Sequence, residues 1–118
     1  MLDHVSLRVS DFARSKAFFE KALAPLGYKC MMEFPGVVGF GKDRPDFWIS
    51  QGKTSDPIHI AFGTDERATV DSFYKAATGA GGKDNGKPGI RKEYHPTYYG
   101  AFVLDLDGSN IEAVCHKP

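Results

Sequence analysis

The stretch that decides the fold runs from Tyr98 to Val114 and reads YYGAFVLDLDGSNIEAV. Two apolar runs flank Asp107-Gly108, and an Asp-Gly pair in this setting predicts a β-hairpin. The second arm of the hairpin carries one acid, Glu112, between apolar neighbours. Because an unpaired buried carboxylate is energetically costly, we expect Glu112 to face either water or a partner group.

The composition describes a single globular domain without a charge imbalance. Fifteen basic and fifteen acidic residues cancel, and the sequence shows no basic stripe, so nucleic acid is not an expected partner. Neither a secretory signal nor a membrane-spanning segment is recognisable, so we expect a cytoplasmic protein with no membrane partner. Cys30 and Cys115 are far apart and outside any CxxC spacing, which gives little support to a redox pair or a thiolate metal site.

The first half of the chain predicts a strand, a helix and three further strands. Residues 2–9 alternate between apolar and polar side chains, with His4 on the mixed face of the predicted strand. Ser10 or Asp11 can cap the helix, which stops at Pro25. Short strands are then expected at 28–32, 37–42 and 46–51.

The second half repeats this design. Residues 57–62 predict a strand with His59 on the face opposite the apolar side chains. Thr64 or Asp65 can cap a second helix. Residues 83–97 are rich in glycine, lysine and proline and are expected to form a short strand and a long functional loop. The predicted hairpin over residues 98–114 follows and completes the second half.

An internal repeat relates the two halves. An offset of 55 residues connects the pairs His4 and His59, Phe18 and Phe73, Phe19 and Tyr74, Ala22 and Ala77, and Gly27 and Gly82. If the second half contains about nine extra residues, Trp48 aligns with Glu112 in the last strand of each half. We therefore expect one α+β domain over residues 1–118. Its two βαβββ modules, about 1–54 and 55–118, would form a cleft-shaped mixed sheet with helices on the outer face.

Three side chains of the metal-ligand type share one predicted environment. His4, His59 and Glu112 lie on three separate strands, each on the face opposite the core-facing residues. Two imidazoles and one carboxylate on a rigid scaffold can hold a divalent metal and leave positions open for substrate. The alternative is a polar cleft in which both histidines hydrogen-bond Glu112.

Three motifs also carry a family resemblance. They are His4 followed by Val9-Ser10-Asp11, then His59-Ile60-Ala61-Phe62, and finally Asp105-Leu106-Asp107-Gly108-Ser109-Asn110-Ile111-Glu112. Together they resemble the vicinal oxygen chelate superfamily, which includes glyoxalase I, fosfomycin-resistance thiol transferases, bleomycin-resistance proteins and extradiol dioxygenases. The family's usual turn is Asp-Pro-Asp-Gly-Asn, from which Leu106 and Ser109 depart.

The resemblance implies a metal site and a ligand set. The ligands would be His4, His59 and Glu112, and the metal would be Zn, Ni, Mn, Co or Fe. Trp48 stands where glyoxalase I has a fourth ligand, a glutamate, so the remaining set resembles that of the thiol transferases and dioxygenases.

Several other side chains are less specific candidates for catalytic or substrate-binding residues. His95 precedes Pro96 in a tyrosine-rich loop and could be an acid-base group on a lid or an aromatic-packed structural residue. His116 is expected to be solvated. The candidate substrate-binding residues are Trp48, Arg91, Tyr98 and Tyr99.

These observations predict a glyoxalase-like, metal-dependent enzyme of the lyase, isomerase or transferase type. It would act on a small oxygen-bearing substrate chelated to the metal, with Glu112 and His95 as catalytic residues. The alternative is a non-catalytic, ligand-sequestering protein similar to the bleomycin-resistance group. The resemblance also implies a homodimer, with the cleft built within one chain or across two.

Overall fold

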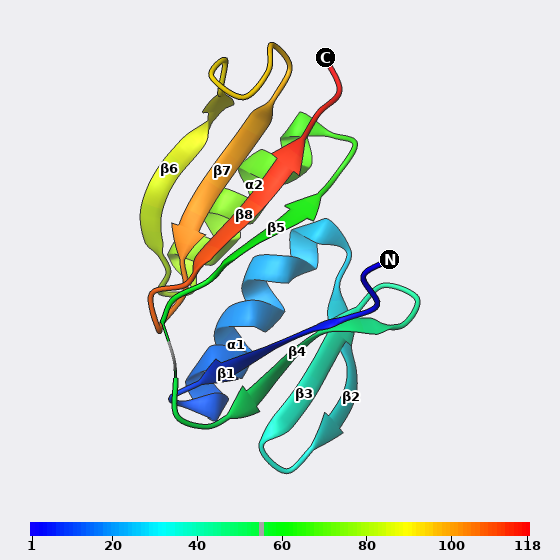
Figure 1. Ribbon diagram of the computed structural model, residues 1–118, viewed down its shortest axis with the longest axis vertical. Helices are drawn as coiled ribbons and strands as arrows, with labels where there is room; N and C mark the ends of the chain where they lie inside the picture. The colour runs from blue at the N-terminus through cyan, green and yellow to red at the C-terminus, as the bar shows by residue number, and fades with distance from the viewer. Residues whose placement is uncertain (55) are drawn as a thin grey trace.

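Two βαβββ modules make up the computed structural model, which describes residues 1–54 and 56–118 (Figure 1). The first module contains β1 (Val5–Val9), α1 (Phe12–Leu23), the short 3-10 helix η1 (Ala24–Leu26), β2 (Lys29–Phe34), β3 (Val37–Gly41) and β4 (Pro45–Gln51). The second contains β5 (His59–Gly63), α2 (Arg67–Gly79), β6 (Lys83–Ile90), β7 (Tyr99–Leu104) and β8 (Asn110–Cys115). The predicted α+β class and paired modules are confirmed. The predicted start of the second module, residue 55, lies outside the described residues.

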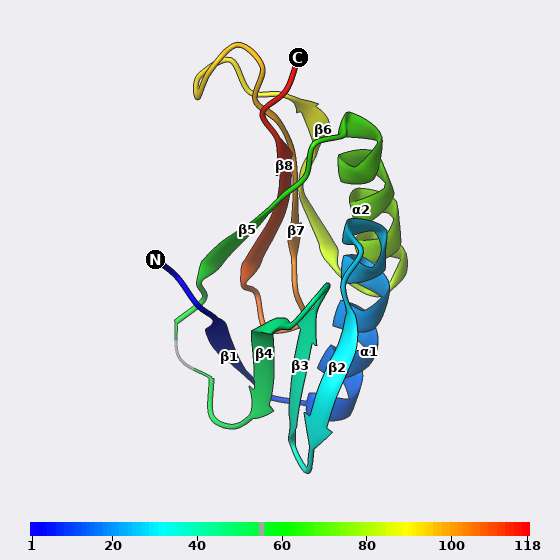
Figure 2. The ribbon, with the colours of Figure 1, turned by 90° about the vertical axis from the view of Figure 1, so that its right-hand side faces the viewer.

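Each module has one four-stranded mixed sheet, and the two sheets share a topology. Their strand orders are β1-β4-β3-β2 and β5-β8-β7-β6. The first strand of each module pairs in parallel with its last strand, and the other pairs are antiparallel. Figure 2 shows both helices on the same side of the sheets. The opposite faces of the sheets therefore carry no helix formed by the described residues.

The strand register confirms the internal repeat. Ser6 lies opposite Trp48 in the first sheet, and Ala61 lies opposite Glu112 in the second. Ser6 and Ala61 each follow their candidate histidine by two residues. Trp48 and Glu112 therefore occupy equivalent positions, as the sequence alignment of the two halves predicts.

One hydrophobic core runs through both modules beneath the helices. α1 packs against α2, and each helix buries a phenylalanine completely, Phe19 and Phe73 respectively. The ring of Phe47 on β4 lies 5.0 Å from that of Phe19 and 5.5 Å from that of Phe62 on β5. Phe47 thus joins the core of the first module to a strand of the second.

The predicted start is correct for α1 but not for α2. Asp11 caps α1 as predicted, since its side chain accepts a hydrogen bond from the Arg14 amide at 3.2 Å. α2 begins later than the sequence predicts, because Glu66 is its N-cap. The hydroxyl of Thr64, one of the predicted caps, instead accepts from the Glu66 amide at 3.4 Å. With 12 and 13 residues, neither helix of the described chain is long and apolar enough to cross a membrane.

β6 is longer than the short strand that the sequence predicts. It pairs with β7 over Lys83–Ile90, and its register shifts twice, between Asp84 and Gly86 and between Gly86 and Gly89. Such irregular pairing lets a strand include glycine and proline, which interrupt a regular ladder.

Gly82 occupies a point where the fold leaves no room for a side chain. A Cβ atom there would lie 2.5 Å from Val103 Cγ1 and 2.8 Å from Phe18 Cε1. We expect Gly82→Ala to lower the free energy of unfolding by about 1–3 kcal/mol, because the core must shift to admit the methyl group. The urea midpoint measures this loss. Gly79→Ala is the control, since among the described residues nothing lies within 4 Å of its Cβ, and equal midpoints for the two variants would contradict the packing.

Candidate functional site

Glu112 lies at the centre of a polar cluster on the helix-free face of the second sheet. Its neighbours on β8, Ile111 and Ala113, belong to the hydrophobic core. Because side chains alternate along a strand, Glu112 points to the other face. The residue is nevertheless only 1% exposed. A carboxylate this deeply buried requires partner groups.

Both carboxylate oxygens of Glu112 have a partner. His59 Nε2 lies 2.8 Å from Oε1, and the Tyr98 hydroxyl donates to Oε2. An ionised carboxylate can only accept, so Nε2 of His59 carries the proton in this arrangement. Burial, followed by the hydrogen bond to Glu112, raises the pKa of Tyr98 above its ordinary value. Tyr98 therefore remains a hydrogen-bond donor at neutral pH.

Gly100 makes room for this cluster. A Cβ atom at Gly100 would lie 3.1 Å from Tyr98 Cε1 and 3.3 Å from Glu112 Oε2. Gly100 is not among the predicted site residues. The sequence does carry a signal for it, because a glycine inside a predicted strand often marks a close approach of another group.

His95 and His116 form a second pair beside Tyr98. His95 Nε2 lies 2.7 Å from His116 Nδ1, and the two rings stack with centroids 5.0 Å apart. The ring of Tyr98 stands edge-on to both, at 5.3 and 5.2 Å. The Thr97 amide donates to His95 Nδ1 at 3.2 Å, so in the neutral pair His95 carries its proton on Nε2 and donates it to His116. The structure thus shows aromatic packing around His95, which was one of the two alternatives for this residue, and His116 is exposed yet hydrogen-bonded.

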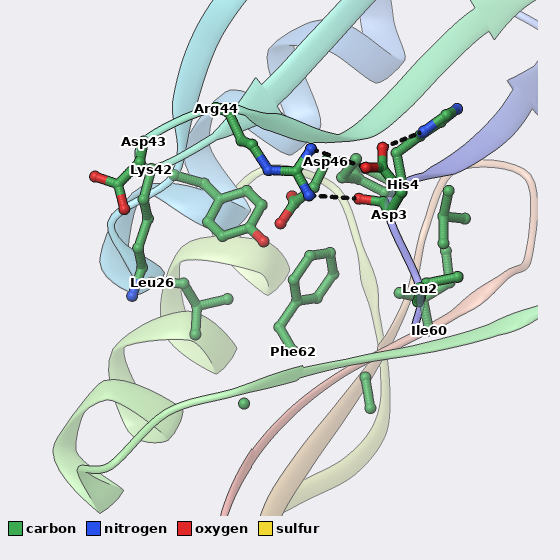
Figure 3. A pocket seen from close by; sticks show the side chains of 15 residues that line it. Leu2, Asp3, His4, Leu26, Lys42, Asp43, Arg44, Asp46, Ile60 and Phe62 are labelled. Carbon is green, nitrogen blue, oxygen red and sulfur yellow. Dashed lines mark hydrogen bonds and ion pairs between the residues drawn. The ribbon is translucent and has the colours of Figure 1, made fainter.

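His4 lies just before β1 and not on it, so the prediction that His4 is part of the first strand is wrong. Its Nδ1 is 2.8 Å from Asp3 Oδ1, and Arg44 Nη1 lies 3.2 Å from Asp3 Oδ2 (Figure 3). His4 and Arg44 together hold the pKa of the Asp3 carboxyl below its usual value. Over residues 1–54 and 56–118 of one chain, no three His, Cys, Asp or Glu side chains gather closely enough to hold a metal ion. The structure therefore brings together His59 and Glu112 and leaves His4 apart.

A pocket of about 470 Å³ lies beside His4, between the two modules (Figure 3). Leu26, Phe47 and Phe62 supply apolar parts of its wall. Lys42 and Arg44 add charge to its lining, and Glu112 and His59 are not among its lining residues. This pocket thus belongs to the junction of the modules and not to the Glu112 cluster.

The remaining candidate substrate residues lie in three different places. Trp48 is half-buried, and its ring lies so close to Gly39 that a Cβ there would approach Trp48 Cε2 to 2.9 Å. Tyr99 faces α2, because its hydroxyl donates to Asp71 at 2.6 Å. Only Tyr98 and Arg91 join the face that carries Glu112, Arg91 through its contact with Phe102.

The donor set of the Glu112 cluster suits a divalent metal. An imidazole nitrogen and a carboxylate oxygen are ligands that Zn, Fe, Mn, Ni and Co accept, and here they already converge. The hydrogen bond from Tyr98 orients the carboxylate in the way that outer partners of metal ligands commonly do. A third protein ligand would have to come from outside this cluster.

No protein-family model matches this chain. The uncharacterized protein YqjT of Bacillus subtilis (strain 168) is 24% identical over 131 residues, which cover 96% of this chain and 97% of YqjT.

Solved structures are similar over the whole chain. A glyoxalase/bleomycin resistance protein from Albidiferax ferrireducens T118 has a TM-score of 0.83 and 24% identity, covering 98% of this chain and 97% of that one. A glyoxalase/bleomycin resistance protein/dioxygenase family enzyme from Burkholderia phytofirmans PsJN has a TM-score of 0.76 and 19% identity, with 97% of each chain covered. A glyoxalase I mutant from Zea mays has a TM-score of 0.70 and 26% identity over 96% of this chain and 46% of that one. The predicted resemblance is confirmed: this chain has the vicinal oxygen chelate fold of the glyoxalase, bleomycin resistance and dioxygenase proteins.

Proposed function

We propose that this protein is a glyoxalase-like, metal-dependent enzyme that acts on a small oxygen-bearing substrate. One observation carries the proposal. His59 Nε2 lies 2.8 Å from Oε1 of Glu112, whose carboxylate is almost completely buried. A buried carboxylate lowers the stability of the fold, so proteins keep such groups mainly where they serve a function. The His59–Glu112 pair is therefore a strong candidate for a metal site.

His4 of a second copy of the chain is our proposed third ligand. In one chain His4 lies apart from Glu112, and its Nδ1 is hydrogen-bonded to the exposed Asp3. The side chains of His4 and His59 are 54% and 53% exposed, so both can be reached by another chain. Each four-stranded sheet also has open edge strands, which a homodimer could cover. The cleft would then lie across two chains.

In the proposed enzyme, the metal ion, Tyr98 and His95 would have different roles. A divalent ion bound there would polarise a substrate oxygen. Tyr98 would fix the carboxylate of Glu112 through its hydroxyl. His95 is the proposed group for proton transfer, because its ring packs on Tyr98 and its Nε2 connects through His116 to solvent.

Metal binding tests the proposal directly. Chelator-treated protein should bind Zn²⁺, Mn²⁺, Ni²⁺ or Co²⁺ in calorimetry and gain about 2.7 kcal/mol of stability at a metal concentration 100 times Kd. His59→Ala and Glu112→Gln should each weaken binding by more than the roughly 10–100-fold that loss of an outer partner costs. Glu33→Gln, which removes an exposed carboxylate paired with Lys16, is the control. If none of these ions binds or raises the melting temperature, the proposal is wrong.

Mixed dimers test the position of the site. His4→Ala chains and Glu112→Gln chains should each lose metal binding alone. Mixed after reversible dissociation, they should recover one functional site in each heterodimer, because one site then has both a native His4 and a native Glu112. Failure of mixing to restore binding would place all ligands in one chain.

One observation favours a second function, ligand sequestration without chemistry. Glu112 is fully paired by His59 and Tyr98, and an aromatic residue, Trp48, takes the equivalent position in the first module. Under this alternative, His59→Ala would leave the affinity for an aromatic ligand largely unchanged.

A further inference from the structure

A row of side chains crosses the helix-free face of the second sheet and ends at Arg91. The register places Phe102 of β7 opposite Glu112 of β8, and Gly86 of β6 opposite Phe102. Neighbouring strands are about 4.8 Å apart, so Phe102 is one strand from Glu112 and Gly86 is two strands from it. Since Gly86 has no side chain, the space above it is open to another residue.

Arg91 fills that space. Its Cζ lies 5.3 Å from the centroid of the Phe102 ring, and its Nη2 donates to the Lys87 carbonyl at 2.6 Å. A Cβ atom at Gly86 would approach Nη2 to 3.1 Å, and one at Gly89 would approach Nη1 to 3.2 Å. The two glycines therefore form a cradle in which the guanidinium group lies beside Phe102.

The guanidinium group is positioned without an anion. None of the ion pairs formed between described residues involves Arg91, which is half-buried. A guanidinium has five N–H donors in a fixed planar fork, and the contact with Lys87 uses one side of it. Such a group can bind a carboxylate with two parallel hydrogen bonds and little loss of side-chain freedom.

Phe102 connects this cation to the proposed metal site. The ring of His59 lies 6.2 Å from the ring of Phe102, which also contacts Arg91. A ligand that reaches both Glu112 and Arg91 would cross the Phe102 ring over a distance on the order of 5–10 Å, or one to two strand spacings.

We infer that Arg91 binds a carboxylate at the end of the substrate opposite its metal-chelating oxygens. The substrate class is then a short acid whose second anionic group lies two or three carbons from the chelating oxygens. This inference rests on the proposed function for the chelating end only, because Arg91 itself touches neither His59 nor Glu112.

Two 2-oxo acids test the inference. Pyruvate and 2-oxoglutarate share the chelating group, but only 2-oxoglutarate has a second carboxylate two methylene groups away. Calorimetry on the metal-loaded protein should show 2-oxoglutarate binding about ten-fold or more tightly than pyruvate, the size expected for a charged hydrogen-bonded pair. Arg91→Met should remove this preference and leave the affinity for pyruvate unchanged. Arg91→Lys, which keeps the charge without the fork, should retain part of it.

Lys92→Met is the matched control, because Lys92 is an exposed cation adjacent in sequence. It should keep the full preference for 2-oxoglutarate. Equal affinities of the two acids for the native protein, or a preference that survives in Arg91→Met, would overturn the inference while metal binding stands.

Failure of metal binding would be a separate result. In that case the side-chain N–H resonances of Arg91 decide the inference in the metal-free protein. They should shift with glutarate and not with neutral glutaramide, and no shift with glutarate would overturn it.

Discussion

Tyr98→Phe is expected to lower the free energy of unfolding by about 1.5–3 kcal/mol, although it removes a single oxygen atom. The Tyr98 hydroxyl donates to Glu112 Oε2, and Glu112 is buried. Without this donor, one oxygen of a buried carboxylate loses its protein partner, and water has little access to replace it. Urea unfolding followed by circular dichroism measures the change.

Tyr99→Phe is the matched control for this prediction. The Tyr99 hydroxyl also donates to a carboxylate, that of Asp71, but Asp71 is exposed and water can replace the lost donor. We expect a change below about 1 kcal/mol. Similar losses for the two variants would show that Glu112 does not depend on Tyr98.

Tyr98→Phe should also weaken metal binding under the proposed function. A hydrogen-bonded partner of a metal ligand typically contributes about 10–100-fold in affinity. Tyr98→Phe should therefore bind metal more weakly than the native protein but more tightly than Glu112→Gln. An unchanged metal affinity would assign Tyr98 to stability alone.

Phe47→Ala is expected to cost about 3–5 kcal/mol, the largest loss that we predict for a single substitution. The Phe47 side chain is 2% exposed, and its ring contacts those of Phe19, Phe40 and Phe62. Truncation removes packing in both modules at once. Since single domains are stable by only about 5–15 kcal/mol, the variant should melt far below the native protein.

The control for Phe47 is Phe34→Ala on β2, because Phe34 is 52% exposed. It should change stability by less than about 0.5 kcal/mol. We further expect a single unfolding transition in the native protein, since the modules share one core. Comparable losses for Phe34→Ala and Phe47→Ala, or two separate transitions, would contradict a shared core.

Much of the fold follows from local signals in the sequence. The alternation around His4 and His59 predicts strands whose apolar side chains face the helices, and Asp11 marks the start of α1. Gly108 has a φ of 89°, a left-handed conformation that favours glycine, so the turn before β8 is encoded where it occurs. The internal offset then predicts that Trp48 and Glu112 are equivalent.

Other features depend on contacts that no local signal specifies. The sequence places Tyr98 and Tyr99 on opposite faces but does not reveal which of them meets Glu112. That choice follows from the pairing of β7 with β8 and from the packing of α2. The contact of Arg91 with Phe102 accompanies the register shifts of β6, which lie between Asp84 and Gly86 and between Gly86 and Gly89.

The sequence by itself thus determined the two modules, the turn before Glu112 and the sheet face to which His59 and Glu112 belong. Periodicity, capping and turn residues act over a few neighbouring positions, so they are readable along the chain. Only the tertiary structure decided that His59 meets Glu112 while His4 is bonded to Asp3 in another part of the chain. The arrangement of the modules depends on the burial of side chains such as Phe47 and Phe62, which are distant in sequence and close only after folding.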